Sequence, residues 1–94
     1  MLSKSPINLE KISKENIDKE ILRAGIMAEL DAINLYEQMA ALAQDEKIKI
    51  ILLDVAKEEK THVGEFQTLL LMKDAEQEKE MDEGKKEVHE ELNL

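Results

Sequence analysis

Residues 46–72 read EKIKIILLDVAKEEKTHVGEFQTLLLM, and their hydrophobic pattern predicts one long helix. One face of this helix repeats at steps of four and three residues, the spacing that keeps side chains on one side of an α-helix. That face consists of Ile48, Leu52, Val55, Glu59, His62, Phe66 and Leu69. Two consecutive positions of an otherwise apolar face are therefore a carboxylate and an imidazole. Because ionised groups are costly to bury alone, Glu59 and His62 need a partner.

A second helix precedes this one and has the same kind of interrupted face. It is expected to begin near Ser13, acting as the N-cap, and to end at about Ala43. Its main face is Leu22, Ile26, Glu29, Ile33, Tyr36 and Ala40, and a neighbouring face is Ile17, Ile21, Ala28, Leu35, Met39 and Leu42. Residues 44–46 are expected to form a short turn in which Asp45 caps the following helix. The two helices then form an antiparallel hairpin.

The composition favours an all-α protein that associates with itself. The chain has 94 residues, 43% of them apolar, with one Pro and three Gly, so few positions favour turns and strand signals are absent. The first helix is apolar over an arc too wide for one hairpin partner to cover. A two-helix unit of this size also has too small a core to be stable alone. We therefore expect two hairpins to dimerise into a four-helix bundle.

The segments on either side of the hairpin are polar. The chain is expected to divide into a flexible N-terminal lead-in, a helical hairpin and a charged C-terminal segment, at residues 1–12, 13–72 and 73–94. The last segment contains nine acids and four Lys. Asp74 with Gln77 three residues later resembles a capping box. The pattern is typical of either a short solvated helix, interrupted or weakened at Gly84, or a partly disordered tail or linker.

The charge and the residue types exclude several function classes. A net charge of -9 argues against nucleic acid and against an anionic membrane surface as partners. The absence of cysteine excludes a disulfide scaffold, a thiol nucleophile, an iron–sulfur cluster and a cysteine zinc site. No apolar run is long enough for a membrane span, and residues 1–8 lack the core of a signal peptide. A cytoplasmic protein is the expectation, and any metal must be held by carboxylates and imidazoles.

The polar residues on the two apolar faces match half of a known ligand set. Carboxylate-bridged di-iron bundles use one Glu from each of two helices and Glu-x-x-His from each of the other two. This chain supplies Glu29 and the pair Glu59 and His62. Its other histidine, His89, has Lys86 three residues before it and completes no second copy of the motif. Two chains would supply the full set, which suits Fe and also Mn or Zn.

Each of these residues also has a simpler interpretation. Alone, Glu29 would be a boundary residue that reaches water, and His62 would be a hydrogen-bonded structural histidine. Their joint placement favours the metal site, with Glu59 bridging and the other two ligands terminal or bridging. Tyr36 either hydrogen-bonds a ligand or passes an electron, or is a core aromatic residue. Asp31 belongs to a solvated face, where its charge could draw ferrous ions toward the site.

Two segments of the sequence resemble the encapsulated ferritins. They are residues 27–38, MAELDAINLYEQ, and residues 54–66, DVAKEEKTHVGEF, and the likeness covers about residues 13–72. The resemblance implies a two-helix protomer whose dimer rebuilds the ferritin site, and a ring-shaped decamer built from dimers. It also implies a ferroxidase that oxidises Fe(II) with dioxygen and delivers ferric iron to a surrounding encapsulin shell. The archaeal members are the most similar, and in some of them this domain is fused to the shell protein.

Carried over by position, Glu29, Glu59 and His62 match the family's ferroxidase ligands, and Tyr36 matches its site tyrosine. Asp31 matches one of the acidic positions through which iron approaches. The chain departs from the pattern at Ala28, where some members have another carboxylate, and at Leu35, where some have Trp. Residues 87–94 contain no convincing shell-targeting peptide.

Two other functions remain open from the sequence. One is a different di-metal enzyme on the same bundle, such as a peroxidase or a manganese protein. Rubrerythrin-type peroxidases usually carry a cysteine-rich iron site as well, and this chain has no cysteine. The other is a non-enzymatic helical dimerisation module, in which buried polar residues fix the register of the helices.

Overall fold

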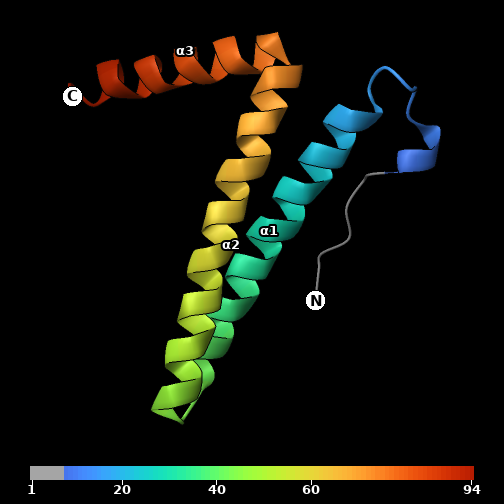
Figure 1. Ribbon diagram of the computed structural model, residues 1–94. Helices are drawn as coiled ribbons and strands as arrows, with labels where there is room; N and C mark the ends of the chain where they lie inside the picture. Colours follow the sequence, from blue (N-terminus) through green and yellow to red (C-terminus); the bar gives the residue numbers. More distant parts are fainter. Residues whose placement is uncertain (1–7) are drawn as a thin grey trace.

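The computed structural model describes residues 8–94, and every regular element in that range is helical. α1 spans Ile17–Leu42, α2 spans Glu46–Lys73 and α3 spans Ala75–Glu91. α1 and α2 lie side by side and antiparallel, and α3 turns away from the end of α2 (Figure 1). The molecule is therefore L-shaped and flat, with extents of 46 × 44 × 20 Å. The predicted all-α hairpin with a C-terminal helix is confirmed.

The core of the hairpin is a single seam between α1 and α2. Its buried residues are Ile33 and Ala40 on α1, and Ala56 and Leu70 on α2. The two alanines are almost fully buried, so they bring the helix backbones close together. Near the other end of α1, Gly25 serves the same purpose, because a Cβ built there would lie 3.2 Å from Cδ2 of Phe66.

Much of the apolar surface is left exposed. The large apolar residues that lie open to solvent include Ile21, Met39 and Leu42 on α1, and Ile48, Ile51 and Leu69 on α2. None of the helices in residues 8–94 is long and apolar enough to cross a membrane. The predicted arc of apolar residues is thus wider than one hairpin partner covers, as the sequence indicated. An exposed apolar surface of this kind marks an interaction site.

The turn of the hairpin has the predicted cap at Asp45 but lies one residue earlier than predicted. Residues 43–45 connect the helices, and the carboxylate of Asp45 accepts a hydrogen bond of 2.8 Å from the backbone N–H of Lys47. This N-cap satisfies a backbone donor that α2 itself leaves unpaired. α2 begins at Glu46, as expected, and ends at Lys73, one residue beyond the predicted end.

The predicted start of the first helix at Ser13 is wrong, because α1 begins at Ile17. The Ser13 hydroxyl accepts a hydrogen bond of 3.1 Å from the side chain of Asn16, and the Ser13 carbonyl accepts one from the Asn16 backbone. The serine therefore closes a turn before the helix and caps no helical N–H. Of the predicted N-terminal lead-in, residues 1–7 lie outside the described residues. Leu9–Lys11 forms a short 3-10 helix, capped by the side chain of Asn8.

The predicted interruption at Gly84 is wrong, because α3 runs through it without a break. Glycine costs about 1 kcal/mol relative to alanine inside a helix. Ion pairs from Lys86 to Asp82 and Glu83 span this part of α3 and offset part of that cost. The start of α3 agrees with the sequence, since Asp74 accepts a hydrogen bond of 3.0 Å from the backbone N–H of Gln77.

The contact at Gly25 can be tested against Gly84, which has open space around it. We expect Gly84→Ala to stabilise the protein by up to about 1 kcal/mol through helix propensity. Gly25→Ala gains the same helix propensity. Its new methyl group, however, pushes against the Phe66 ring, and overpacking of this kind costs about 1–3 kcal/mol. Guanidinium unfolding followed by circular dichroism, at equal protein concentration, should therefore rank Gly25→Ala below wild type and Gly84→Ala above it. Equal midpoints for the two variants would contradict the close approach.

Candidate metal centre

Three predicted site residues meet halfway along the hairpin. Glu29 comes from α1, and Glu59 and His62 come from adjacent turns of α2. One potential ligand atom from each lies within 4.8 Å of the other two. Nδ1 of His62 is 3.4 Å from Oε2 of Glu29 and 3.4 Å from Oε2 of Glu59. The spacing of three residues on α2 and the hairpin fold bring these groups together, as the sequence predicted.

The packing beside the cluster sets the register of the two helices. Ile33 lies one turn after Glu29 on α1, and Ala56 lies one turn before Glu59 on α2, and both are buried. On the outer surface, Nζ of Lys60 pairs with Oε2 of Glu37 at 3.0 Å. An exposed ion pair of this kind contributes about 0–1 kcal/mol. The sequence pattern did not reveal the Lys60–Glu37 pair, because its partners are far apart in the chain and both face solvent.

The cluster leaves one buried carboxylate oxygen without a hydrogen bond. The side chains of Glu29 and Glu59 are 17% and 19% exposed, whereas that of His62 is 44% exposed. Oε2 of Glu29 is buried and makes no hydrogen bond, since its contact with His62 lacks hydrogen-bond geometry. A buried unsatisfied polar group costs about 1–3 kcal/mol, and more when it is charged. A bound cation would remove this cost.

The three groups fit a transition metal. Two ligands bound to one ion at about 2.1 Å lie about 3.0–3.4 Å apart, which matches the distances from His62 to the two carboxylates. Carboxylate and imidazole together suit Fe, Mn and Zn. Within residues 8–94, one chain brings three potential ligands to the cluster, and its imidazole is partly open to solvent. The cluster is therefore an incomplete site with space for ligands from outside the chain.

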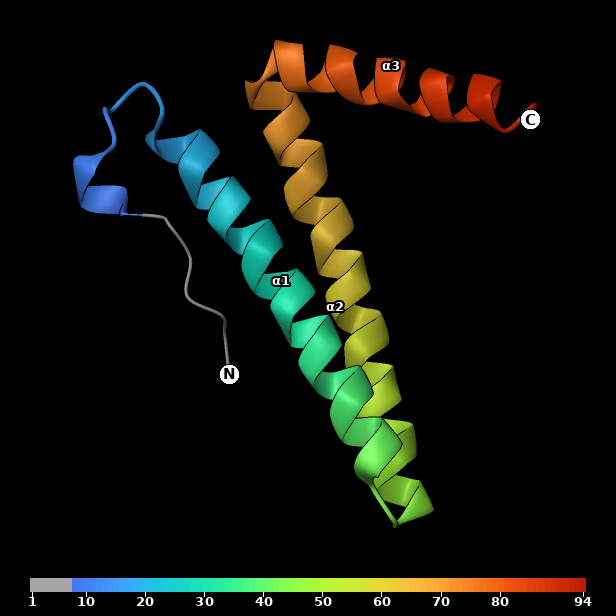
Figure 2. The same cartoon turned by 180° about the vertical axis from the view of Figure 1, so that it is seen from behind.

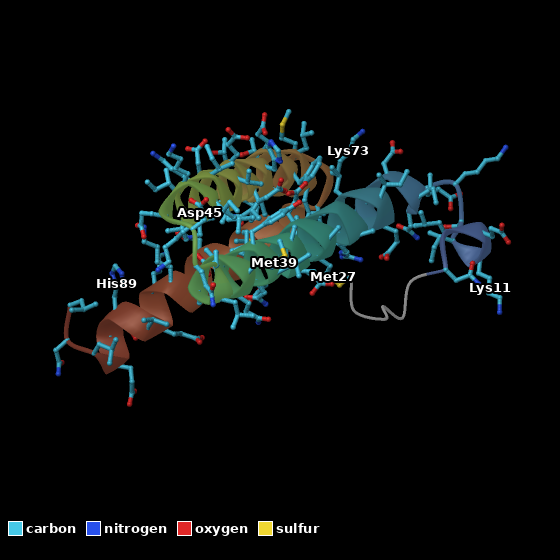
Figure 3. All side chains as sticks on the ribbon, turned by 90° about the horizontal axis from the view of Figure 1, so that it is seen from below. Lys11, Met27, Met39, Asp45, Lys73 and His89 are labelled. Carbon is cyan, nitrogen blue, oxygen red and sulfur yellow. The ribbon has the colours of Figure 1, made fainter. Side chains whose placement is uncertain are left out.

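The other candidate residues lie around this cluster. Tyr36 follows Glu29 by two turns on α1, is partly buried, and makes no hydrogen bond within residues 8–94. Asp31, also on α1, does not belong to the three-residue group. His89 lies on α3, apart from the hairpin (Figure 3). In the described part of the chain, Glu29, Glu59 and His62 form the only such group of three.

A comparison with protein families agrees with this geometry. A model of the EncFtn-like family matches residues 5–85, which include all three clustered residues. The chain belongs to the EncFtn-like family. This EncFtn-like chain is 58% identical, over 93 residues and 96% of its length, to a ferritin-like-encapsulin shell fusion protein of Pyrococcus furiosus. It covers 27% of that relative, so it spans about a quarter of the fused protein.

A solved structure matches the EncFtn-like chain along its whole length. The crystal structure of the encapsulated ferritin domain from Pyrococcus furiosus superposes with a TM-score of 0.84 and 53% sequence identity. The match covers 100% of this chain and 98% of the other. The resemblance to the encapsulated ferritins is confirmed, and the match includes α3 as well as the hairpin.

The metal centre predicts that cations stabilise the protein through these three residues. A ligand at 100 times its Kd adds about 2.7 kcal/mol to the free energy of unfolding. We expect Co(II) to raise the guanidinium midpoint of the wild type, and Glu29→Gln to lose most of that increase. Glu37→Gln, which removes an exposed acid of the same helix, serves as the matched control. The centre would be refuted if Co(II) stabilised Glu29→Gln as much as it stabilises Glu37→Gln.

Proposed function

We propose that the chain is a ferroxidase that oxidises Fe(II) with dioxygen at a di-iron site shared by two copies. The observation that carries this proposal is the meeting of Glu29, Glu59 and His62, together with the buried Oε2 of Glu29 that makes no hydrogen bond. Membership of the EncFtn-like family supports an iron-related, ferritin-like function. The resemblance assigns the same three residues to the ferroxidase ligands.

Ligand number and charge both favour a second copy of the chain. Each chain brings two carboxylates and one imidazole to the site, so a pair brings four carboxylates and two imidazoles. Two divalent ions carry the charge of +4 that balances four carboxylates. A single chain holding one ion would leave its coordination incomplete and His62 open to water. Two ions between two copies would satisfy the ligands of both.

The exposed apolar surface provides a reason for the copies to associate. Leu69 lies two turns after His62 on α2 and is exposed in the single chain. Leu22 and Leu69 border a small hollow near the open end of the hairpin, and its walls are mostly apolar. Contact with a second hairpin would cover this surface and remove water from the ligands. We propose that association and completion of the site are the same event.

The chemistry at the site is a paired electron transfer from substrate iron. Two ferrous ions each lose one electron, and dioxygen takes up both electrons and two protons to give hydrogen peroxide. The carboxylates of Glu29 and Glu59 hold the ions close together and favour the higher ferric charge. His62 offers Nδ1 as a ligand on the same side of α2. The hydroxyl of Tyr36 is free to hydrogen-bond a ligand, and we assign Asp31 to drawing ferrous ions toward the site.

The identity of the Pyrococcus relative supports a role with an encapsulin shell. That protein is a ferritin-like-encapsulin shell fusion, and this chain corresponds to about a quarter of it. We propose that the ferroxidase works inside such a shell and passes ferric iron to its interior for storage. The ring-shaped decamer built from dimers stays a prediction from the resemblance.

The ferroxidase assignment predicts different behaviour for two neighbouring glutamates. In aerobic Fe(II) oxidation followed by absorbance, we expect Glu59→Ala to lose the rapid phase. Glu58→Ala should keep that phase, because Glu58 is exposed and lies outside the cluster. Circular dichroism should show that both variants keep the helices.

Two outcomes would count against the proposal. Equal, slow oxidation by the wild type and both variants would leave a helical oligomer whose site serves another metal or sets its register. Rapid turnover of added peroxide without deposition of iron would instead favour a peroxidase on the same bundle.

The shared site predicts that activity depends on one apolar face. Leu69 and Leu53 are equally exposed, at 48% and 47%, but only Leu69 lies on the face of His62. Leu53 precedes Glu59 by six residues and so points about 120° away from it. We expect Leu69→Glu to give a smaller species and slow Fe(II) oxidation, although every ligand remains. Leu53→Glu should keep the dimer and its activity, as measured by native mass spectrometry and the absorbance assay. An active monomer of Leu69→Glu would refute the shared site.

A further inference from the structure

The change of direction between α2 and α3 takes place at one residue. α2 ends at Lys73 and α3 begins at Ala75, so Asp74 alone forms the corner, with φ -138° and ψ 88°. Beyond its first turns, α3 projects away from both hairpin helices (Figures 1 and 2). α3 has no packing contact with α1 along its length. The direction of all 17 residues of α3 therefore depends on what holds this corner.

The side chain of Asp74 binds in two directions. Its Oδ1 accepts a hydrogen bond of 3.0 Å from the backbone N–H of Gln77, which caps α3. Its Oδ2 accepts a hydrogen bond of 3.1 Å from Nη2 of Arg23 on α1. The Gln77 N–H holds the pKa of the Asp74 carboxyl below its ordinary value against an opposing effect of burial, and Lys19 and Arg23 add to the lowering. The carboxylate is thus charged at neutral pH.

Arg23 is itself held in place on α1. Its Nη1 donates to Oε1 of Glu20 at 2.6 Å, one turn earlier on the same helix. It is also the one arginine of the sequence. Because its guanidinium is planar, Arg23 can bind two carboxylates in a fixed geometry, which a lysine ammonium does not reproduce.

We propose that the Asp74 carboxylate is the joint that fixes the direction of α3 relative to the hairpin. The cap bond ties the carboxylate to the first turn of α3, and the Arg23 bond ties the same carboxylate to α1. The corner, α1 and α3 then form a closed loop of contacts, so rotation about the backbone of Asp74 must break one of them. With only the cap bond, α3 stays helical but can swing about the corner. This inference is independent of the metal centre.

The joint can be tested by measuring the direction of α3. Because the chain has no cysteine, Lys57→Cys on α2 and Glu90→Cys on α3 provide two exposed and specific sites for spin labels. Labelled protein is mixed with an excess of unlabelled protein so that only distances within one chain contribute. We expect a single narrow distance peak in the otherwise wild-type chain. That narrow peak should be lost in both Arg23→Gln and Asp74→Asn, because each variant removes the ion pair. In Asp74→Asn the amide oxygen can still cap α3.

Three controls separate a loose joint from a lost helix. Lys86→Gln removes ion pairs within α3 but no link to the hairpin, and should keep the narrow peak. Hydrogen exchange at the Gln77 amide should stay slow in Asp74→Asn and become fast in Asp74→Ala. Circular dichroism should show equal helix content in Arg23→Gln and the wild type. An unchanged narrow peak in both Arg23→Gln and Asp74→Asn would overturn the proposal, because other contacts would then set the direction.

Discussion

The structure depends on charged ligands placed inside an apolar seam that one chain is too small to close. Glu29 and Glu59 are mostly shielded from water, and one of their oxygens has no hydrogen-bond donor. Burying such groups costs several kcal/mol per ion unless a counter-charge is present. A two-helix hairpin cannot supply that counter-charge and also cover its own apolar faces. In the proposed assembly, a second copy and metal ions on the open side would meet both needs.

The small residues of the seam are as important to the site as its ligands. Ala40 and Ala56 are almost fully buried, and Gly25 lies against the ring of Phe66. These residues let α1 and α2 approach closely, so that the side chain of Glu29 comes within reach of Glu59 and His62. A bulkier seam would move α1 outward and separate the carboxylates. The pattern that sets helix packing therefore also sets the distances between the ligands.

The sequence was most informative where one local rule decided the outcome. Steps of four and three residues placed Glu29, Glu59 and His62 on facing helices, and Asp45 and Asp74 capped the helices that follow them. The start of α1 was misplaced because the side chains of Ser13 and Asn16 bind each other, a choice that a cap motif does not reveal. A break at Gly84 does not form, because the helix continues on both sides of the glycine and ion pairs of Lys86 span this part of α3. The Arg23–Asp74 contact joins residues far apart in the chain, so no periodic pattern could reveal it.

The position of the ligands along the hairpin suits a site shared between two copies. Glu29 is the thirteenth of the 26 residues of α1, and Glu59 is the fourteenth of the 28 residues of α2. A two-fold axis through the centre of the hairpin, perpendicular to the helices, leaves equal lengths of helix on both sides. In this arrangement the ends of the second hairpin would coincide with the ends of the first, and little apolar surface would extend beyond the partner. The same placement keeps the ligands far from the helix ends, where fraying would disturb them. A site near the turn would give up both advantages, since part of each hairpin would project beyond its partner.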